Sequence, residues 1–140
     1  MNIEIDNIIK FFSNDNFAGS AGIKIDSVTE DSVECSMEIK DIHRNALGAV
    51  QGGAIFTLAD LTFAVHSNLD NVCGLDVGST VGQSCNISYL NSTRGNHLFA
   101  KSKCLNKGRK MSVYKIDITD DLNKSIAMMI GNGFTIAKRC

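Results

Sequence analysis

The run from Gly52 to Ser67 constrains the fold of this chain more than any other segment. It is rich in alanine and leucine, it is long enough for a central helix, and it carries a single carboxylate, Asp60. Because such a helix is apolar on nearly every side, most of its surface must be buried. One sheet covers only one side of a helix, so a second cover is required, and an identical chain is its simplest supplier.

Strand patterns lie on both sides of this predicted helix. Residues 32–39 alternate apolar and polar side chains, which is the pattern of a half-buried strand, and residues 23–29 precede them as a hairpin partner. Beyond the helix, Asn-, Gly- and Asp-containing turns separate four long predicted strands, at residues 77–91, 97–106, 110–120 and 124–137. Short turns between successive strands favour an antiparallel meander.

The first 22 residues hold one further element. Residues 3–12 place apolar side chains at near-helical spacing and predict a short amphipathic helix. The segment from Ser13 to Gly22 contains Asn, Asp, Ser and Gly and predicts a loop, with Phe17 as a candidate to turn inward. The whole order predicts an α+β fold in which an antiparallel sheet curls around one central helix, with a short N-terminal helix.

Length and composition limit the possible classes of protein. The 140 residues suit one domain, residues 1–140. Apolar residues make up 44% and charged residues 21%, as in a folded globular protein. The net charge of −1 gives no broad attraction to nucleic acid or to an anionic membrane, and no apolar stretch reaches about 18 residues. We therefore expect neither nucleic acid nor membrane as a partner.

The five cysteines predict neither a metal site nor a disulfide framework. Their number is odd, none belongs to a Cys-x-x-Cys pair, and zinc-ligand spacing is absent. Cys35, Cys85 and Cys104 lie in alternating runs and are interpreted as small buried hydrophobic residues. Since the amino terminus also lacks the pattern of a signal peptide, we expect a cytoplasmic protein.

Asp60 is the first candidate for a functional residue. Its neighbours within one helical turn are mostly apolar, and an ionised carboxylate among them is costly unless it is paired or hydrogen-bonded. The functional interpretation is a carboxylate held for work as a general base or nucleophile. The alternative is an aspartate at a helix edge that touches water.

The sequence Gln51-Gly52-Gly53 opens the same helix. The first N–H groups of a helix lack intrahelical partners and carry the positive end of its dipole. Glycine lets a substrate approach that backbone, so an oxyanion formed from a carbonyl would be stabilised there. The alternative is that the glycines only form a sharp turn into the helix.

Helix geometry limits how Gly52 and Asp60 can cooperate. They are eight residues apart, which is about 12 Å along the axis at about 1.5 Å per residue. Both cannot touch one acyl carbon within a single chain. If both act, they must come from different subunits.

Residues 43–60, HRNALGAVQGGAIFTLAD, resemble the signature of hotdog-fold acyl-CoA thioesterases, specifically the PaaI-like (phenylacetic acid degradation) branch. Two later segments also fit, residues 86–90 (NISYL) and Gly108-Arg109. The resemblance implies a hotdog fold and hydrolysis of acyl-CoA thioesters with aromatic or short- to medium-chain acyl groups. It also implies no metal or cofactor beyond the CoA of the substrate, and a site shared across a homodimer that commonly pairs into a homotetramer.

The resemblance also implies roles for single residues. Asp60 matches the catalytic acid, which attacks the thioester carbonyl or activates water. Gly52 matches the residue whose N–H polarises that carbonyl, and Asn45 matches one that orients the active-site loop or the substrate. Gln51, beside Gly53, stands where the family usually has histidine. Glutamine can hold a thioester by hydrogen bonds but cannot carry a proton charge.

Three further residues are candidates for substrate binding. His43 opens the signature, where packing of the loop is an alternative to a role with substrate. Lys107 and Arg109 belong to a cluster of cations on two strands and their turn. They could bind the phosphates of CoA or simply form a solvated face.

Two other functions are alternatives to thioester hydrolysis. A hotdog dehydratase or hydratase uses a different acid and histidine motif, so the spacing from Asn45 through Gly52 to Asp60 argues against it. A non-catalytic acyl-CoA-binding protein is favoured only by Gln51. Assay of thiol release from a panel of CoA esters separates these functions.

Overall fold

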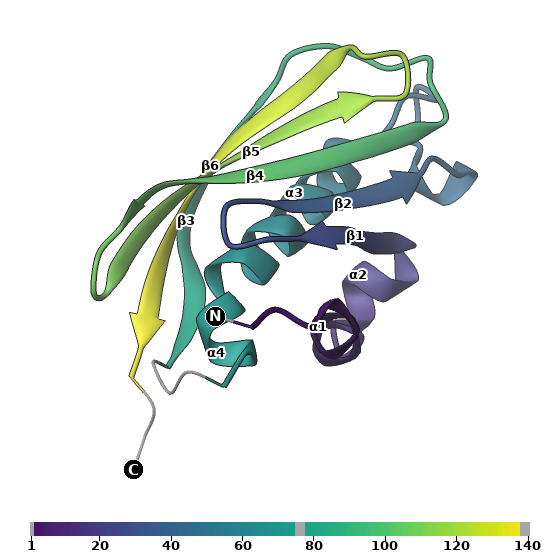
Figure 1. Ribbon diagram of the computed structural model, residues 1–140. Helices are drawn as coiled ribbons and strands as arrows, with labels where there is room; N and C mark the ends of the chain where they lie inside the picture. Colours follow the sequence, from purple (N-terminus) through teal and green to yellow (C-terminus); the bar gives the residue numbers. More distant parts are fainter. Residues whose placement is uncertain (1, 75–77, 138–140) are drawn as a thin grey trace.

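The computed structural model describes residues 2–74 and 78–137. Its helices lie to one side of a single curved sheet, and α3 lies along the concave face (Figure 1). The elements in chain order are α1 (Ile5–Phe12), α2 (Asn16–Ser20), β1 (Ile23–Val28), β2 (Val33–Glu38), the 3-10 helix η1 (Asp41–His43), α3 (Gly52–Ser67), α4 (Leu69–Val72), β3 (Ser79–Tyr89), β4 (His97–Lys107), β5 (Met111–Asp120) and β6 (Ser125–Ile136).

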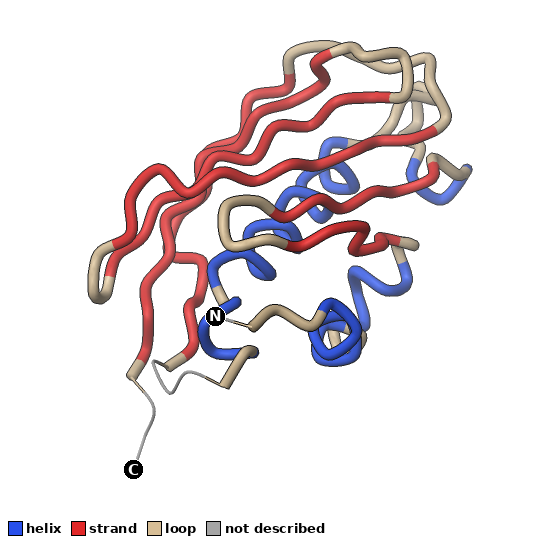
Figure 2. The backbone as a smooth tube through the Cα atoms, in the orientation of Figure 1, coloured by secondary structure: helices blue, strands red, loops and turns tan. Residues whose placement is uncertain are grey.

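The sheet has six strands in the order β1-β2-β4-β5-β6-β3, and every recorded pairing is antiparallel. The predicted meander is confirmed for β4, β5 and β6. β3 pairs with β6 rather than with its successor in sequence, which places β3 at one edge of the sheet. Figure 2 shows the strands as one continuous curved layer with the helices on one side. The predicted α+β hotdog fold is therefore confirmed.

The core forms between α3 and the concave face of the sheet. Leu58 and Val65 of α3 are fully buried, as are Ile116 and Ile118 of β5. Phe63 packs edge-on against the ring of Tyr114, with 5.6 Å between ring centroids. Space for Phe63 depends on β6, because a Cβ at Gly131 would lie 3.0 Å from its ring.

The predicted loop from Ser13 to Gly22 is wrong, because it contains α2. The Asp15 side chain accepts a hydrogen bond of 3.0 Å from the N–H of Ala18, and so caps the helix. The expected inward turn of Phe17 is also wrong, since 72% of this residue is exposed in the single chain. The short helix α4 likewise lies in a segment for which the sequence pattern predicted no element.

The described cysteines are free thiols. Cys35 is buried as predicted, whereas Cys85 and Cys104 are half-buried. Cys140 and the start of the strand predicted from residue 77 lie outside the described residues. Among the described helices, none is both long and apolar enough to cross a membrane.

Candidate active site

Asp60 lies on the least covered face of α3. Its neighbours Leu58, Ala59 and Leu61 are buried, whereas Asp60 and Gly53 are exposed in the single chain. Residues 53, 57, 60 and 64 share one face of a helix by its periodicity. The carboxylate therefore sits on the face of α3 that the sheet of its own chain does not cover.

The surroundings of Asp60 raise its pKa above the ordinary value of 3.8. The larger cause is the loss of hydration beside neighbouring protein, and the smaller is the negative charge of Asp15. The pKa of the Cys85 thiol on β3 is also raised, by burial and then by the charge of Asp60. Asp60 is thus exposed to solvent yet incompletely hydrated, and a raised pKa makes it a stronger base than a free aspartate.

The amino end of α3 presents two backbone donors. Gln51 is the N-cap residue, and its carbonyl accepts from the N–H groups of Ala54 and Ile55 at 3.0 and 3.3 Å. Within residues 2–74 and 78–137, no acceptor is recorded for the N–H groups of Gly52 or Gly53. These groups lie at the positive end of the helix dipole and can bind an anionic oxygen.

Asn45 organises the loop that leads into α3. Its side-chain Oδ1 accepts from the N–H groups of Leu47 at 2.9 Å and Ala49 at 3.2 Å. Its own N–H donates to the carbonyl of Ala49 at 2.8 Å. The turn requires a positive φ of 81° at Gly48, which glycine adopts without strain. These hydrogen bonds stabilise the shape of the loop.

His43 is buried and hydrogen-bonded on both sides of its ring. Its Nδ1 accepts from the N–H of Lys40 at 2.9 Å. Its Nε2 then carries the proton and donates to the carbonyl of Ala21 at 2.7 Å. The ring thus joins α2 to the loop before α3, and it also forms part of the wall of a cavity beside Gly53.

Two cavities flank the amino end of α3. One of about 430 Å³ reaches Gly52, and its wall includes Ile55, Tyr89 and Leu90. The other, of about 260 Å³, reaches Gly53 on the side where α2 packs, and is lined by Phe17, Ser20, Ala21, Ile42, His43, Gln51, Gly53, Ala54 and Thr57. Gly52 therefore lies on the wall of the first cavity, and Gly53 lies on the wall of the second.

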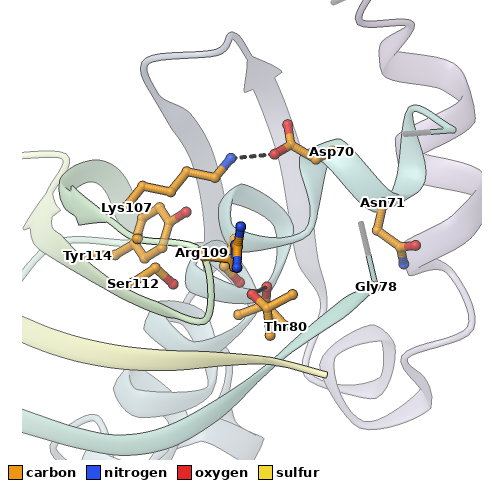
Figure 3. A pocket seen from close by; sticks show the side chains of 11 residues that line it. Asp70, Asn71, Gly78, Thr80, Lys107, Arg109, Ser112 and Tyr114 are labelled. Carbon is orange, nitrogen blue, oxygen red and sulfur yellow. Dashed lines mark hydrogen bonds and ion pairs between the residues drawn. The ribbon is translucent and has the colours of Figure 1, made fainter. Parts of the chain in front are cut away.

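Lys107 and Arg109 lie at the opposite end of α3. They line a cavity of about 350 Å³ together with Thr80, Ser112 and Tyr114 (Figure 3). The ammonium group of Lys107 forms an ion pair with Asp70 at the rim of this cavity. Lys101, another cation of β4, pairs with Glu34 at 3.3 Å.

Comparison with known proteins decides the family. Residues 47–127, more than half of the chain, match the family model of the thioesterase superfamily. The chain belongs to this superfamily.

The relatives of this thioesterase-superfamily domain include the acyl-coenzyme A thioesterase PaaI of Escherichia coli. It is 28% identical over 126 residues, which cover 89% of this chain and 86% of that protein. The solved structure of the E. coli PaaI protein has a TM-score of 0.82 at 26% identity, covering 94% of this chain and 92% of that one. A Streptococcus mutans structure bound to acetyl CoA has a TM-score of 0.72 at 25% identity, covering 84% and 91%. The predicted likeness to the PaaI-like branch is confirmed.

Two features of the superfamily domain's site escaped the sequence analysis. The Tyr89 hydroxyl donates to the carbonyl of Gly52 at 2.9 Å, although 37 positions separate the two residues. Phe17 reaches the wall of the cavity beside Gly53 from a segment predicted to be a loop. The alternating pattern of β3 signals a strand, but it does not reveal which helix the strand ends against.

The polar side chains of β3 at positions 80 and 84 are hydrogen-bonded to β6 rather than to Asp60. Ser84 accepts from the Asn132 amide at 2.9 Å, and Thr80 shares a hydrogen bond of 2.9 Å with Thr135. The β3 side chain whose pKa responds to Asp60 is Cys85. Within the described residues, no three His, Cys, Asp or Glu side chains gather closely enough to hold a metal ion.

Proposed function

We propose that this protein hydrolyses acyl-CoA thioesters with aromatic or short- to medium-chain acyl groups. Asp60 of one subunit acts as nucleophile or general base, and the Gly52 N–H of another stabilises the oxyanion. The observation that carries this proposal is the pair of N–H groups at Gly52 and Gly53, for which the described part of the chain holds no recorded acceptor. They lie at a helix amino terminus beside two cavities of suitable size for the arms of a thioester.

The chemistry requires one base and one oxyanion site. In the general-base route, Asp60 takes a proton from water as the water oxygen attacks the carbonyl carbon. The carbonyl oxygen becomes an oxyanion and accepts from the Gly52 N–H. Its collapse breaks the carbon–sulfur bond and releases CoA thiolate, which is then protonated. In the nucleophilic route the carboxylate of Asp60 attacks the carbonyl carbon first and expels CoA thiolate. Water then hydrolyses the resulting anhydride, which releases the acid and restores the Asp60 carboxylate.

The structure supports a site shared between subunits. α3 is continuous from Gly52 to Ser67, so the separation of about 12 Å between Gly52 and Asp60 applies within one chain. β3 forms a long edge of the sheet, and Val81 on it is 45% exposed. Because such an edge can pair with another strand, a homodimer joined beside β3 would cover the Asp60 face. Pairing of two dimers into a homotetramer is part of the same proposal.

The cavity at the far end of α3 fits the nucleotide end of CoA. Lys107 and Arg109 offer two cations beside the hydroxyl groups of Thr80 and Ser112, a set that suits phosphate oxygens. We propose that a phosphate competes with Asp70 for the ammonium of Lys107. Gln51 and Gly53, with His43 behind them, would then line the acyl or pantetheine path at the other end.

Thiol release from phenylacetyl-, butyryl- and octanoyl-CoA tests the activity directly. We expect turnover of at least one of these esters by the intact chain. Binding of the esters without turnover would instead establish the non-catalytic acyl-CoA-binding function that Gln51 favours. A single turnover in ¹⁸O-labelled water then tests the nucleophilic route, because label in the Asp60 carboxylate arises only when water attacks the Asp60 carbon of an anhydride.

Subunit complementation tests the shared site. Asp60→Asn and Gly52→Pro chains should each be inactive alone, because the first lacks the carboxylate and the second lacks the N–H of residue 52. A mixed dimer holds one intact pair, Gly52 from the first chain and Asp60 from the second. Random mixing of the two chains should therefore restore about a quarter of the wild-type activity. No recovery in verified mixed dimers would show that each chain builds its site alone.

A further inference from the structure

Tyr89 makes two contacts with Gly52. Its hydroxyl donates a hydrogen bond of 2.9 Å to the carbonyl of Gly52. Its ring lies against the glycine, so that a Cβ at position 52 would be 3.0 Å from Cζ and 3.1 Å from the hydroxyl oxygen. Tyr89 also lines the cavity of about 430 Å³. The last residue of the edge strand β3 thus holds the first residue of α3.

The hydrogen bond to the Gly52 carbonyl also affects the N–H of Gly53, because both groups belong to one peptide unit. The Gly52 carbonyl and the Gly53 N–H belong to the same planar trans peptide and point in opposite directions. A donor on the carbonyl therefore fixes the direction of the N–H. It also polarises the peptide, which strengthens the N–H as a donor. Gly53 N–H has no recorded acceptor among the described residues.

We propose that Tyr89 is a positioning residue that makes the Gly53 N–H a second donor to the oxyanion, beside that of Gly52. This inference rests on the proposed thioester hydrolysis. The oxyanion would then accept from two consecutive backbone N–H groups, and the edge strand β3 would help to align them through Tyr89. Tyr89 does not touch the reacting carbonyl, because its hydroxyl is on the opposite end of the Gly52–Gly53 peptide.

The same contact disfavours a side chain at position 52. A methyl group there would push the Tyr89 phenol away by a few tenths of an ångström and weaken its bond to the Gly52 carbonyl. Gly52→Ala and substitutions at Tyr89 should therefore act on one contact, and effects on one contact are not additive.

Tyr89→Phe is the test, because it removes the hydroxyl and keeps the ring. We expect kcat to fall about fivefold, with KM and the urea midpoint unchanged. Ser88→Ala is the matched control, since it removes an exposed hydroxyl from the adjacent residue of β3. The Gly53 amide proton should move upfield in Tyr89→Phe but not in the control. Since the ring current is retained, such a shift reports the loss of polarisation.

The outcomes separate this inference from the proposed function. An active wild type whose kcat and Gly53 amide shift are unchanged by Tyr89→Phe would overturn the role of Tyr89 and leave the hydrolysis intact. A wild type that releases no thiol from any ester would overturn both. As a second measurement, Gly52→Ala should lower kcat less in a Tyr89→Ala background than in the wild type. Equal losses in the two backgrounds would show that the ring contact does not matter.

Discussion

The polar groups at the two ends of helix α3 differ in how completely they are hydrogen-bonded within the protein. At the amino end, Gly52 and Gly53 present N–H groups without a recorded protein acceptor among the described residues. At the carboxyl end, His66 is 6% exposed and both ring nitrogens are hydrogen-bonded. The first arrangement leaves donors available to a substrate, and the second uses every donor and acceptor to join elements of the fold.

The carboxyl end is a small closed network. The Ser102 hydroxyl donates to His66 Nδ1 at 2.7 Å and accepts from the Val33 N–H at 2.8 Å. His66 Nε2 then donates to the Glu30 carbonyl at 3.1 Å. These bonds tie α3 to β2, β4 and the turn between β1 and β2. Substitutions at the amino end of α3 should therefore alter activity, and substitutions in the network at its carboxyl end should alter stability.

Asp60→Asn should give the largest effect. We expect kcat/KM to fall at least about 100-fold, because the base or nucleophile is lost. The raised pKa means that the folded state binds more protons than the unfolded state above pH 3.8. Stability therefore falls as pH rises through that window, and the asparagine variant should be at least as stable as the wild type at neutral pH. Thiol-release kinetics and urea unfolding measure both effects, and hydrolysis at the wild-type rate would refute the mechanism.

Ser102→Ala should show the opposite pattern. It leaves His66 Nδ1 and the Val33 N–H buried without partners, which should lower the free energy of unfolding by about 2–4 kcal/mol. Activity per folded molecule should stay within about twofold, because the network lies away from the amino end of α3. Ser88→Ala serves again as the control. If Ser102→Ala kept the wild-type free energy of unfolding but lost activity, the carboxyl end of α3 would belong to the active site.

Lys107→Gln tests whether residues near the carboxyl end of α3 also bind substrate. We expect KM for an acyl-CoA to rise about fivefold through loss of a phosphate contact. KM for the matching acyl-pantetheine, which lacks the nucleotide, should not change. Asp70→Asn frees the ammonium of Lys107 and should not raise KM for the CoA ester. Equal effects on both esters would exclude the phosphate role.

The smallest expected effect is a change in the free energy of unfolding with pH, caused by the buried imidazole of His66. Burial lowers the pKa of His66 below 6.5, so the unfolded chain binds more protons just below that pH. Stability should therefore fall as pH drops from 8 to 6, by less than about 1 kcal/mol. Urea titrations of the wild type and His66→Gln at both pH values measure the difference. A wild type that gains stability on acidification relative to the variant would contradict the buried neutral state.

Much of the fold was predictable because its signals are local. The bounds of α3 follow from an apolar run that opens with two glycines, and the six strands follow from alternation and turns. α2 was missed because its signal is one capping side chain, Asp15, within a polar segment. Phe17 could not be placed, since its surroundings depend on how α2 meets α3.

The candidate site was predictable only in part. Asp60 stands out as the single carboxylate of α3, and its distance from Gly52 means that the two residues would have to come from different subunits if both act. The role of His66 was not predictable, because a histidine near a helix end also suits the helix dipole. His66 is buried against Ser102, which lies 36 positions away in the sequence. This burial lowers the pKa of His66, whereas a helix dipole alone would raise it.

By itself, the sequence determined the helix, the strands, the odd carboxylate and the glycine pair, because periodicity and backbone preference act over a few residues. Only the tertiary structure decided that β3 returns to pair with β6 at the sheet edge. That return brings Tyr89 onto Gly52. Contacts between residues so far apart depend on the path of the whole chain, which local preferences do not specify.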